Sequence, residues 1–72
     1  MISYEPFYAT LRDRNMSTYK LINQFRTSRS LLDRLKHNKP LSTVTIDDLC
    51  RILSCRVEDV LTFVPDQNRE NA

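Results

Sequence analysis

The amino-acid sequence predicts an all-α fold of five short helices in one small domain. Apolar residues recur at the three- and four-residue spacing of a buried helix face in consecutive segments. Residue types that favour helix starts (Ser, Thr and Pro) stand at the beginning of most of these segments. A chain of 72 residues buries only about 60% of its unfolded surface, so the core is thin and there is room for one domain.

End signals place the first two helices. Pro6 suits the first position of a helix that ends near Arg14, because its missing N–H would have no helical partner there. Asn15 is expected to end this helix in the left-handed conformation, since the chain contains no glycine. Ser17 then caps a second helix, whose buried stripe is Leu21, Ile22 and Phe25.

Similar signals place the other three helices. Ser28 caps a third helix with Leu32 and Leu35 facing inward, and Asn38 is expected to end it. Residues 40–44 form a connecting loop, and Thr45 caps a fourth helix. The buried stripe of the fourth helix is Ile46, Leu49, Cys50 and Leu53. A fifth helix, which stops at Pro65, carries the stripe Val57, Val60, Leu61 and Val64.

These segments define the domain and its expected core. The domain spans residues 1–66, and residues 67–72 form a flexible polar tail. The segment Ile2-Ser3-Tyr4 has strand-like composition and is compatible with a short pairing to Phe63-Val64. The expected core residues are Phe7, Leu11, Leu21, Ile22, Phe25, Leu32, Leu35, Ile46, Leu49, Cys50, Leu53, Val57, Val60 and Leu61.

The charge is unevenly distributed along the chain. Residues 17–39 hold six of the eleven basic residues and one acid, Asp33, which gives this segment a net charge of +5. The rest of the chain carries five basic residues and eight acids, a net charge of −3. Two helices around a short turn with this concentration of positive charge are typical of proteins that bind duplex DNA.

Other classes of function are excluded by what the chain lacks. It has no glycine loop for phosphates, no apolar run of membrane-spanning length and no signal-peptide pattern, so we expect a cytoplasmic protein with no cofactor. Cys50 and Cys55 are expected to be buried structural thiols, because two cysteines alone complete no zinc site and a cytosolic disulfide is disfavoured. No nucleophile–base order or metal cluster is present, so we expect no enzyme.

The order of the segments resembles the Cro and phage-repressor (XRE-type) helix-turn-helix family, in its small single-domain branch. The resemblance covers about residues 2–66. It is carried by Met16-Ser17 before Leu21-Ile22, Ser28-Arg29-Ser30 before Leu32 and Arg34-Leu35, the segment Thr45-Ile46-Asp47-Asp48-Leu49-Cys50, and Asp59-Val60-Leu61 with Phe63-Val64-Pro65. The family turn usually has a glycine and then a buried aliphatic residue, and Arg26 and Thr27 occupy those places here.

The resemblance implies a sequence-specific DNA-binding regulator, in most cases a repressor, whose third helix lies in the major groove. Its outward residues would be Ser28, Arg29, Ser30, Asp33, Arg34 and His37. Arg29 is suited to a bidentate guanine contact, and Asp33 is expected mainly to hold Arg29 or Arg34. The expected phosphate contacts are Thr18, Tyr19 and Lys20 on the second helix and Lys36, Asn38 and Lys39 at the end of the third.

Two further questions remain open at the level of sequence. One alternative is a helix-turn-helix protein-interaction module of the antitoxin or anti-repressor type, which the departures at Arg26 and Thr27 would suit. The other concerns assembly: the edge Phe63-Val64-Pro65, with Ile2 and Tyr4, could form a homodimer contact, either in the free protein or only on DNA. The competing interpretation is that Phe63 folds back over the core of its own chain.

Overall fold

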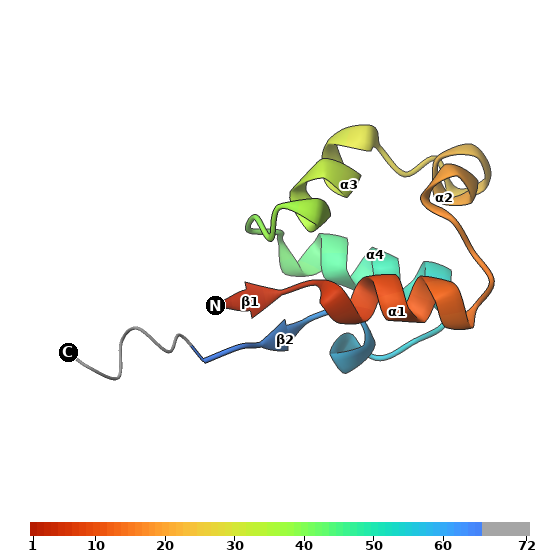
Figure 1. Cartoon of the computed structure of the whole chain (residues 1–72). Coiled ribbons are helices and arrows are strands. Elements are labelled where there is room, and N and C mark those ends of the chain that lie inside the picture. Colours follow the sequence, from red (N-terminus) through yellow and green to blue (C-terminus); the bar gives the residue numbers. More distant parts are fainter. Residues whose placement is uncertain (66–72) are drawn as a thin grey trace.

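The computed structural model describes residues 1–65, and the tail predicted for residues 67–72 lies outside them. Four α-helices, one 3₁₀ turn and a two-stranded sheet make up this part of the chain (Figure 1). Their bounds are β1 (Ile2–Ser3), α1 (Glu5–Asp13), α2 (Thr18–Phe25), α3 (Arg29–Lys36), α4 (Thr43–Leu53), η1 (Val57–Asp59) and β2 (Thr62–Phe63). The helical class is therefore confirmed in outline, with a small sheet added.

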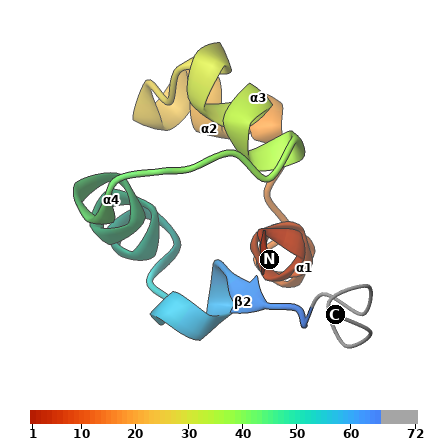
Figure 2. The same cartoon turned by 90° about the vertical axis from the view of Figure 1, so that its left-hand side faces the viewer.

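Helices α1 and α4 lie across the middle of the molecule, with the pair α2 and α3 on one side. The turn η1 and strand β2 lie on the opposite side, and a view turned by 90° shows the same separation (Figure 2). The buried apolar core between these elements consists of Tyr4, Phe7, Leu11, Leu21, Leu35, Ile46, Leu49, Leu53 and Val60. No helix within residues 1–65 has the length and apolar character needed to cross a membrane.

The predicted helix ends around α2 and α3 are confirmed. The Ser17 side chain accepts a hydrogen bond from the Lys20 amide at 3.1 Å, and the Ser28 side chain accepts one from the Leu31 amide at 3.0 Å. Asn15 and Asn38 have φ values of 58° and 53°, in the left-handed region. Without glycine, asparagine is the residue that adopts this conformation with the lowest steric cost.

The start of α4 was predicted three residues too late. Ser42, not Thr45, is the N-cap, and its side chain accepts a hydrogen bond from the Thr45 amide at 3.2 Å. Both residues are good caps. Capping by Ser42 starts the helix earlier, so more backbone groups form helical hydrogen bonds. Part of the predicted loop at residues 40–44 is consequently helical. Helix α4 ends at Leu53, and the residue after it, Ser54, is left-handed with φ of 50°.

The predicted fifth helix is wrong. Only Val57–Asp59 forms a 3₁₀ turn, and Thr62–Phe63 pairs antiparallel with Ile2–Ser3 in the register Ile2 to Phe63 and Ser3 to Thr62. Val64 adds backbone hydrogen bonds to Met1 in both directions. The segment is rich in β-branched residues, and the sheet gives its backbone an alternative set of partners. The strand pair considered from composition is thus present. Its first strand stops at Ser3 instead of Tyr4, and its second lies one residue earlier than proposed.

The core contains eight of the fourteen predicted residues, and four others (Ile22, Leu32, Cys50 and Leu61) are half-buried. Phe25 and Val57 are exposed, which corrects the prediction for both. Phe25 is the last residue of α2, whose contribution to the buried core is Leu21, and Val57 lies in the segment that does not continue as a helix. The sequence pattern missed Tyr4, Thr10 and Thr27, which are buried.

Tyr4 fixes the position of the end of α3 relative to the N-terminal strand. Its hydroxyl donates to the Lys39 carbonyl at 2.8 Å, and its amide donates to the Asn38 side chain at 3.0 Å. The ring is buried in the core, with 4% of its surface exposed. Since Asn38 also provides the left-handed residue that ends α3, one turn both stops this helix and anchors it.

Candidate nucleic-acid interface

Helices α2 and α3 are joined by a turn of three residues, 26–28, that departs from the usual chemistry of such turns. Arg26 has φ of 55° and ψ of 32°, a left-handed conformation that costs a residue with a Cβ atom about 1–2 kcal/mol. Thr27 is buried, and its hydroxyl oxygen has no hydrogen-bond partner within the described residues. The turn therefore keeps a helix-turn-helix backbone while carrying two local energetic penalties.

All eleven residues predicted to bind DNA are solvent-exposed. They lie in three places: the first turn of α2, the length of α3 together with its N-cap, and the two residues that follow α3. The first turn of α2 carries Thr18, Tyr19 and Lys20. Helix α3 with its N-cap carries Ser28, Arg29, Ser30, Asp33, Arg34 and Lys36, and the residues after it are His37 and Lys39. Since α2 and α3 lie together on one side of the molecule, these residues belong to one region of the surface.

The cationic side chains of this region have no partner within residues 1–65. Within residues 1–65, no ion pair or hydrogen bond involves the side chains of Lys20, Arg26, Arg29, Arg34, Lys36 or Lys39. Elsewhere the pattern differs, because Arg14 donates to the Leu53 and Ser54 carbonyls at the end of α4 and Arg51 pairs with Asp47. The region therefore presents cations that remain available to an anionic ligand.

The N-termini of α2 and α3 add backbone donors to the same region. The caps Ser17 and Ser28 each bond the third amide of their helix. The amides of Thr18, Tyr19, Arg29 and Ser30 have no partner within the described part of the chain. Free amides at the positive end of a helix dipole are suited to a phosphate group.

Asp33 does not hold either arginine, which corrects one expectation. Its carboxylate lies 3.3 Å from the Nδ1 atom of His37, one helical turn along α3. Nδ1 is also 2.9 Å from the Asp33 carbonyl oxygen. Both side chains are more than half exposed, so the pair contributes little to stability. Its consequence is that Arg29 and Arg34 are left free, while the single acid of this region is engaged by a neighbour.

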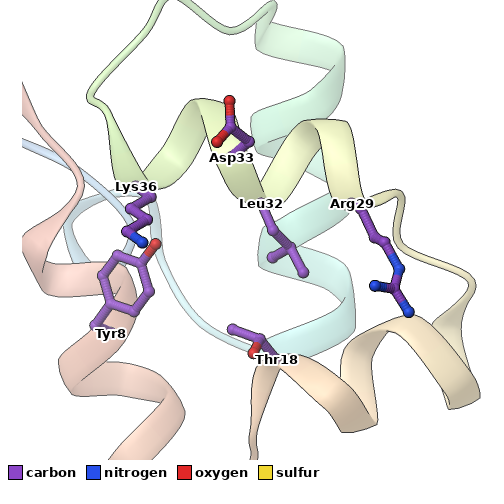
Figure 3. Close-up of a pocket in the computed structure, with 6 residues that line it drawn as sticks. All are labelled: Tyr8, Thr18, Arg29, Leu32, Asp33 and Lys36. Atoms are coloured by element: carbon purple, nitrogen blue, oxygen red, sulfur yellow. The ribbon is translucent and has the colours of Figure 1, made fainter.

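A hollow of about 480 Å³ lies beside α3 and extends the region onto α1. Thr18 lines it from α2, and Arg29, Leu32, Asp33 and Lys36 line it from α3. Tyr8 of α1 closes one side, and Figure 3 shows its ring next to the Lys36 side chain, with Arg29 at the other end and Leu32 between them.

Tyr8 is a residue that sequence reasoning missed as part of the site. Its ring is partly buried against the core, and this burial raises the pKa of the phenol. The hydroxyl is therefore a neutral donor at physiological pH. The sequence offered only the pattern of an apolar helix face, because the contact with α3 depends on how α1 and α3 pack.

The turn that ends α3 begins at one cation, Arg34, and ends at another, Lys39. The Asn38 amide donates to the Leu35 carbonyl at 3.3 Å, and the Lys39 amide donates to the Arg34 carbonyl at 2.9 Å. This pair of bonds around a left-handed residue is the Schellman motif, in which the residues at the positions of Arg34 and Lys39 commonly contact each other. Two like charges so placed favour an anion that neutralises both.

Comparisons with known proteins agree with this geometry. Residues 9–66 match the family model described as the Cro/C1-type HTH DNA-binding domain. The structure is similar to the crystal structure of the transcriptional regulator VanUg, with a TM-score of 0.80 and 26% sequence identity. That similarity covers 90% of this chain and 87% of the other. No curated protein sequence matches the chain.

Proposed function

Because the chain belongs to the Cro/C1-type helix-turn-helix DNA-binding family, we propose that it is a transcriptional regulator, a repressor that binds a specific duplex operator with α3 in the major groove. The observation that carries this proposal is a group of cations on α2, α3 and the residue Lys39 that have no bonding partner within residues 1–65. Cations held by the fold would support a structural role, whereas exposed and unpaired cations on one region fit the binding of a polyanion. The transcriptional regulator VanUg shares this fold, which supports the same class of function.

Base recognition is assigned to the exposed face of α3. Arg29, at the first position of the helix, and Arg34, just over one turn later, are the long donors that can reach guanine O6 and N7. Ser30 lies between them and can donate to or accept from several bases. Asp33 is held by His37, so it is available as an acceptor for a cytosine amino group only where that pair opens.

Phosphate binding is assigned to the flanks of α3. The free amides of Thr18 and Tyr19, with the Lys20 side chain, form one contact at the start of α2. Across the hollow, the Lys36 ammonium and the Tyr8 hydroxyl form a second contact that draws on α1. Phosphate contacts fix the orientation of the protein on the duplex without carrying base information, so this second site would set how α3 enters the groove.

The salt dependence of duplex binding tests the proposal. We expect log K to fall linearly with log salt, and Lys36→Ala to weaken binding to all duplexes alike and lower the slope by about one. Arg56→Ala is the matched control, because it removes the same charge at the start of η1, on the opposite side from α3. Its effect on the slope should be small. Titrations with a fluorescent duplex at several salt concentrations give both slopes.

Absence of duplex binding, or binding that is insensitive to salt, would contradict the proposal. It would favour the alternative of a protein-interaction module. That alternative has support in the turn. A left-handed Arg26 and a buried Thr27 hydroxyl without a partner in residues 1–65 are acceptable in a protein that does not need a fixed angle between α2 and α3 for base recognition. Equal changes of slope in Lys36→Ala and Arg56→Ala would indicate a general charge effect. The assignment of a phosphate contact to Lys36 at the hollow would then be wrong.

A homodimer is the second part of the proposal. One domain makes few phosphate contacts, so a single copy would bind weakly at physiological salt, and pairing on two half-sites about one helical turn apart overcomes this. The sheet presents an apolar edge, since Ile2, Phe63 and Val64 are 42%, 66% and 43% exposed. Such exposure does not fit the competing idea that Phe63 covers its own core. Tyr4, once a candidate for this edge, is buried.

Sedimentation of the protein with and without a palindromic duplex tests the dimer. The wild-type chain should give two copies per duplex, while Phe63→Asp should lose affinity and bind as single copies, because a carboxylate disrupts an apolar contact. Phe63→Leu, which keeps an apolar side chain, should retain the two-copy complex. A wild-type complex of full affinity with one copy per site would refute the dimer. Unfolding of Phe63→Asp, followed by circular dichroism, would instead assign Phe63 to the core.

A further inference from the structure

The two cysteines are brought together by the way α4 ends. Ser54 is left-handed, its amide donates to the Arg51 carbonyl at 3.3 Å, and the Cys55 amide donates to the Cys50 carbonyl at 3.0 Å. These are the two bonds of a Schellman motif, which places the side chains at the positions of Cys50 and Cys55 against each other. The same motif at the end of α1 gives that place to an apolar pair, Leu11 and Met16.

The Cys50 and Cys55 side chains line the same hollow and are partly exposed to solvent. The pKa of Cys55 is raised by burial first and also by the charge of Cys50, by that of Asp59 and by a hydrogen bond to Cys50. Both cysteines are free and only half-buried, which corrects the expectation of fully buried thiols. They line a mainly apolar hollow of about 460 Å³ between α4 and η1, with Ile46, Val57 and Leu61 among its walls. A small molecule can therefore reach them.

The surroundings limit what this pair can do. Within residues 1–65 there is no group of three His, Cys, Asp or Glu side chains able to hold a metal ion, so a four-ligand metal site is not available in this part of the chain. Two neighbouring thiols without further ligands retain one reaction that uses both of them, the formation of a disulfide. The bridge would close a loop whose ends the backbone already holds together, so we expect it to form with little rearrangement of α4.

We propose that Cys50 and Cys55 form an oxidative modification site, a reduced thiol pair that a low-molecular-weight disulfide converts to an intrachain disulfide. One cysteine, as its thiolate, attacks a sulfur of the small disulfide and releases the first small thiol. The second cysteine then attacks the cysteine sulfur of that mixed disulfide and releases the second. The protein loses two electrons and two thiol protons. The small disulfide takes up the two electrons and the two protons and becomes two small thiols. The raised pKa keeps Cys55 protonated and makes attack slow, so equilibrium is the quantity to measure.

The site is independent of the proposed DNA binding. The loop after α4 and η1 lie on the opposite side of the molecule from α3 (Figures 1 and 2). The bridge would join the end of α4 to the residue that precedes Arg56, the N-cap of η1. Closing this loop restricts the unfolded chain more than the folded one, so oxidation is expected to stabilise the fold.

Equilibration of the whole chain in buffers of reduced and oxidised glutathione tests the proposal, with mass spectrometry of acid-quenched samples. We expect one monomeric product, lighter by two hydrogen atoms, and a melting temperature higher by on the order of 10 °C than that of the reduced protein. The equilibrium constant for this product should fall on the order of tenfold or more when the same chain is unfolded in urea, since a bridge that stabilises the fold forms more readily in it. Cys50→Ser and Cys55→Ser should each take up one glutathione and show no rise in melting temperature.

Three results would overturn the proposal. Accumulation of protein with two glutathiones, or of dimers linked between chains, would show that the thiols are not positioned for each other. An equilibrium constant no higher in the folded chain than in urea would show that the fold does not favour the bridge. A bridged protein that melts at a lower temperature would show that α4 must distort to accept it. None of these measurements involves DNA, so they stand whether or not the proposed function is correct.

Discussion

Replacing Thr27 by valine is expected to stabilise the protein, whereas the same replacement at Thr10 is expected to destabilise it. Both threonines are 8% exposed, so the two variants remove a hydroxyl and add a methyl group at positions of equal burial. They differ in their hydrogen bonds. The Thr10 hydroxyl donates to the Asp59 carbonyl at 2.7 Å and joins α1 to η1, while the Thr27 hydroxyl has no partner among the described residues.

The expected magnitudes follow from this difference. A buried polar group without a partner costs about 1–3 kcal/mol, so Thr27→Val should raise the free energy of unfolding by about 1 kcal/mol or more. Thr10→Val should lower it by about 1–3 kcal/mol, because the Asp59 carbonyl loses its donor. For a domain of this size, such changes are a large part of the total stability. Urea unfolding followed by circular dichroism measures both, and an unchanged m-value indicates that the native and unfolded states are comparable.

A destabilised Thr27→Val variant would contradict the argument. It would mean that the hydroxyl has a partner in solution, such as a buried water, and that the turn carries no penalty at this position. Thr10→Val is the control for the effect of added apolar surface, because a general gain of that kind would stabilise both variants. The expected opposite signs therefore isolate the hydrogen bond.

The features that the sequence predicted correctly are local ones. The caps Ser17 and Ser28 and the left-handed residues Asn15 and Asn38 depend on side-chain chemistry within one turn of the chain. The cap of α4 is also a local feature, but the prediction of Thr45 was wrong because Ser42 suits the position equally well and starts the helix earlier.

The features that the sequence did not predict depend on contacts between distant segments. The end of the chain pairs with β1, so the expected helix after Val57 shortens to one turn, and no periodic pattern carries that information. Tyr4 is buried because its hydroxyl meets the Lys39 carbonyl, a contact between residues 35 positions apart. Tyr8 joins the proposed interface for the same reason, through its position against α3.

The candidate site follows the same division. Its residues were identified from sequence by charge and by resemblance. The structure places all of them on the exposed surface of α2, of α3 with its N-cap, and of the residues that follow α3. Their mutual arrangement was less accessible to sequence reasoning. The pairing of Asp33 with His37 instead of an arginine depends on rotamers, as two partners at suitable spacing were available on one helix.

The second large effect is expected at Arg29, on binding and not on stability. Arg29→Ala should weaken binding to the preferred duplex by about 1–3 kcal/mol, a loss of roughly 5- to 150-fold, and should relax preference at one base pair. Arg29 is exposed and makes no ion pair or side-chain hydrogen bond within residues 1–65, so its removal leaves no buried group unsatisfied and the fold should be unaffected. The preferred duplex is first selected by the wild-type chain from a random pool, and each single-base variant is then titrated.

Arg29→Lys separates base recognition from charge. Lysine keeps the positive charge at the first position of α3 but cannot form the planar, bidentate contact to guanine O6 and N7. The salt slope of Arg29→Lys should therefore stay close to that of the wild-type chain, while the preference at the affected base pair falls as it does in Arg29→Ala. If Arg29→Ala weakened all duplexes equally, or if Arg29→Lys kept the full preference, Arg29 would be a phosphate contact. Base recognition would then rest on Ser30 and Arg34 alone.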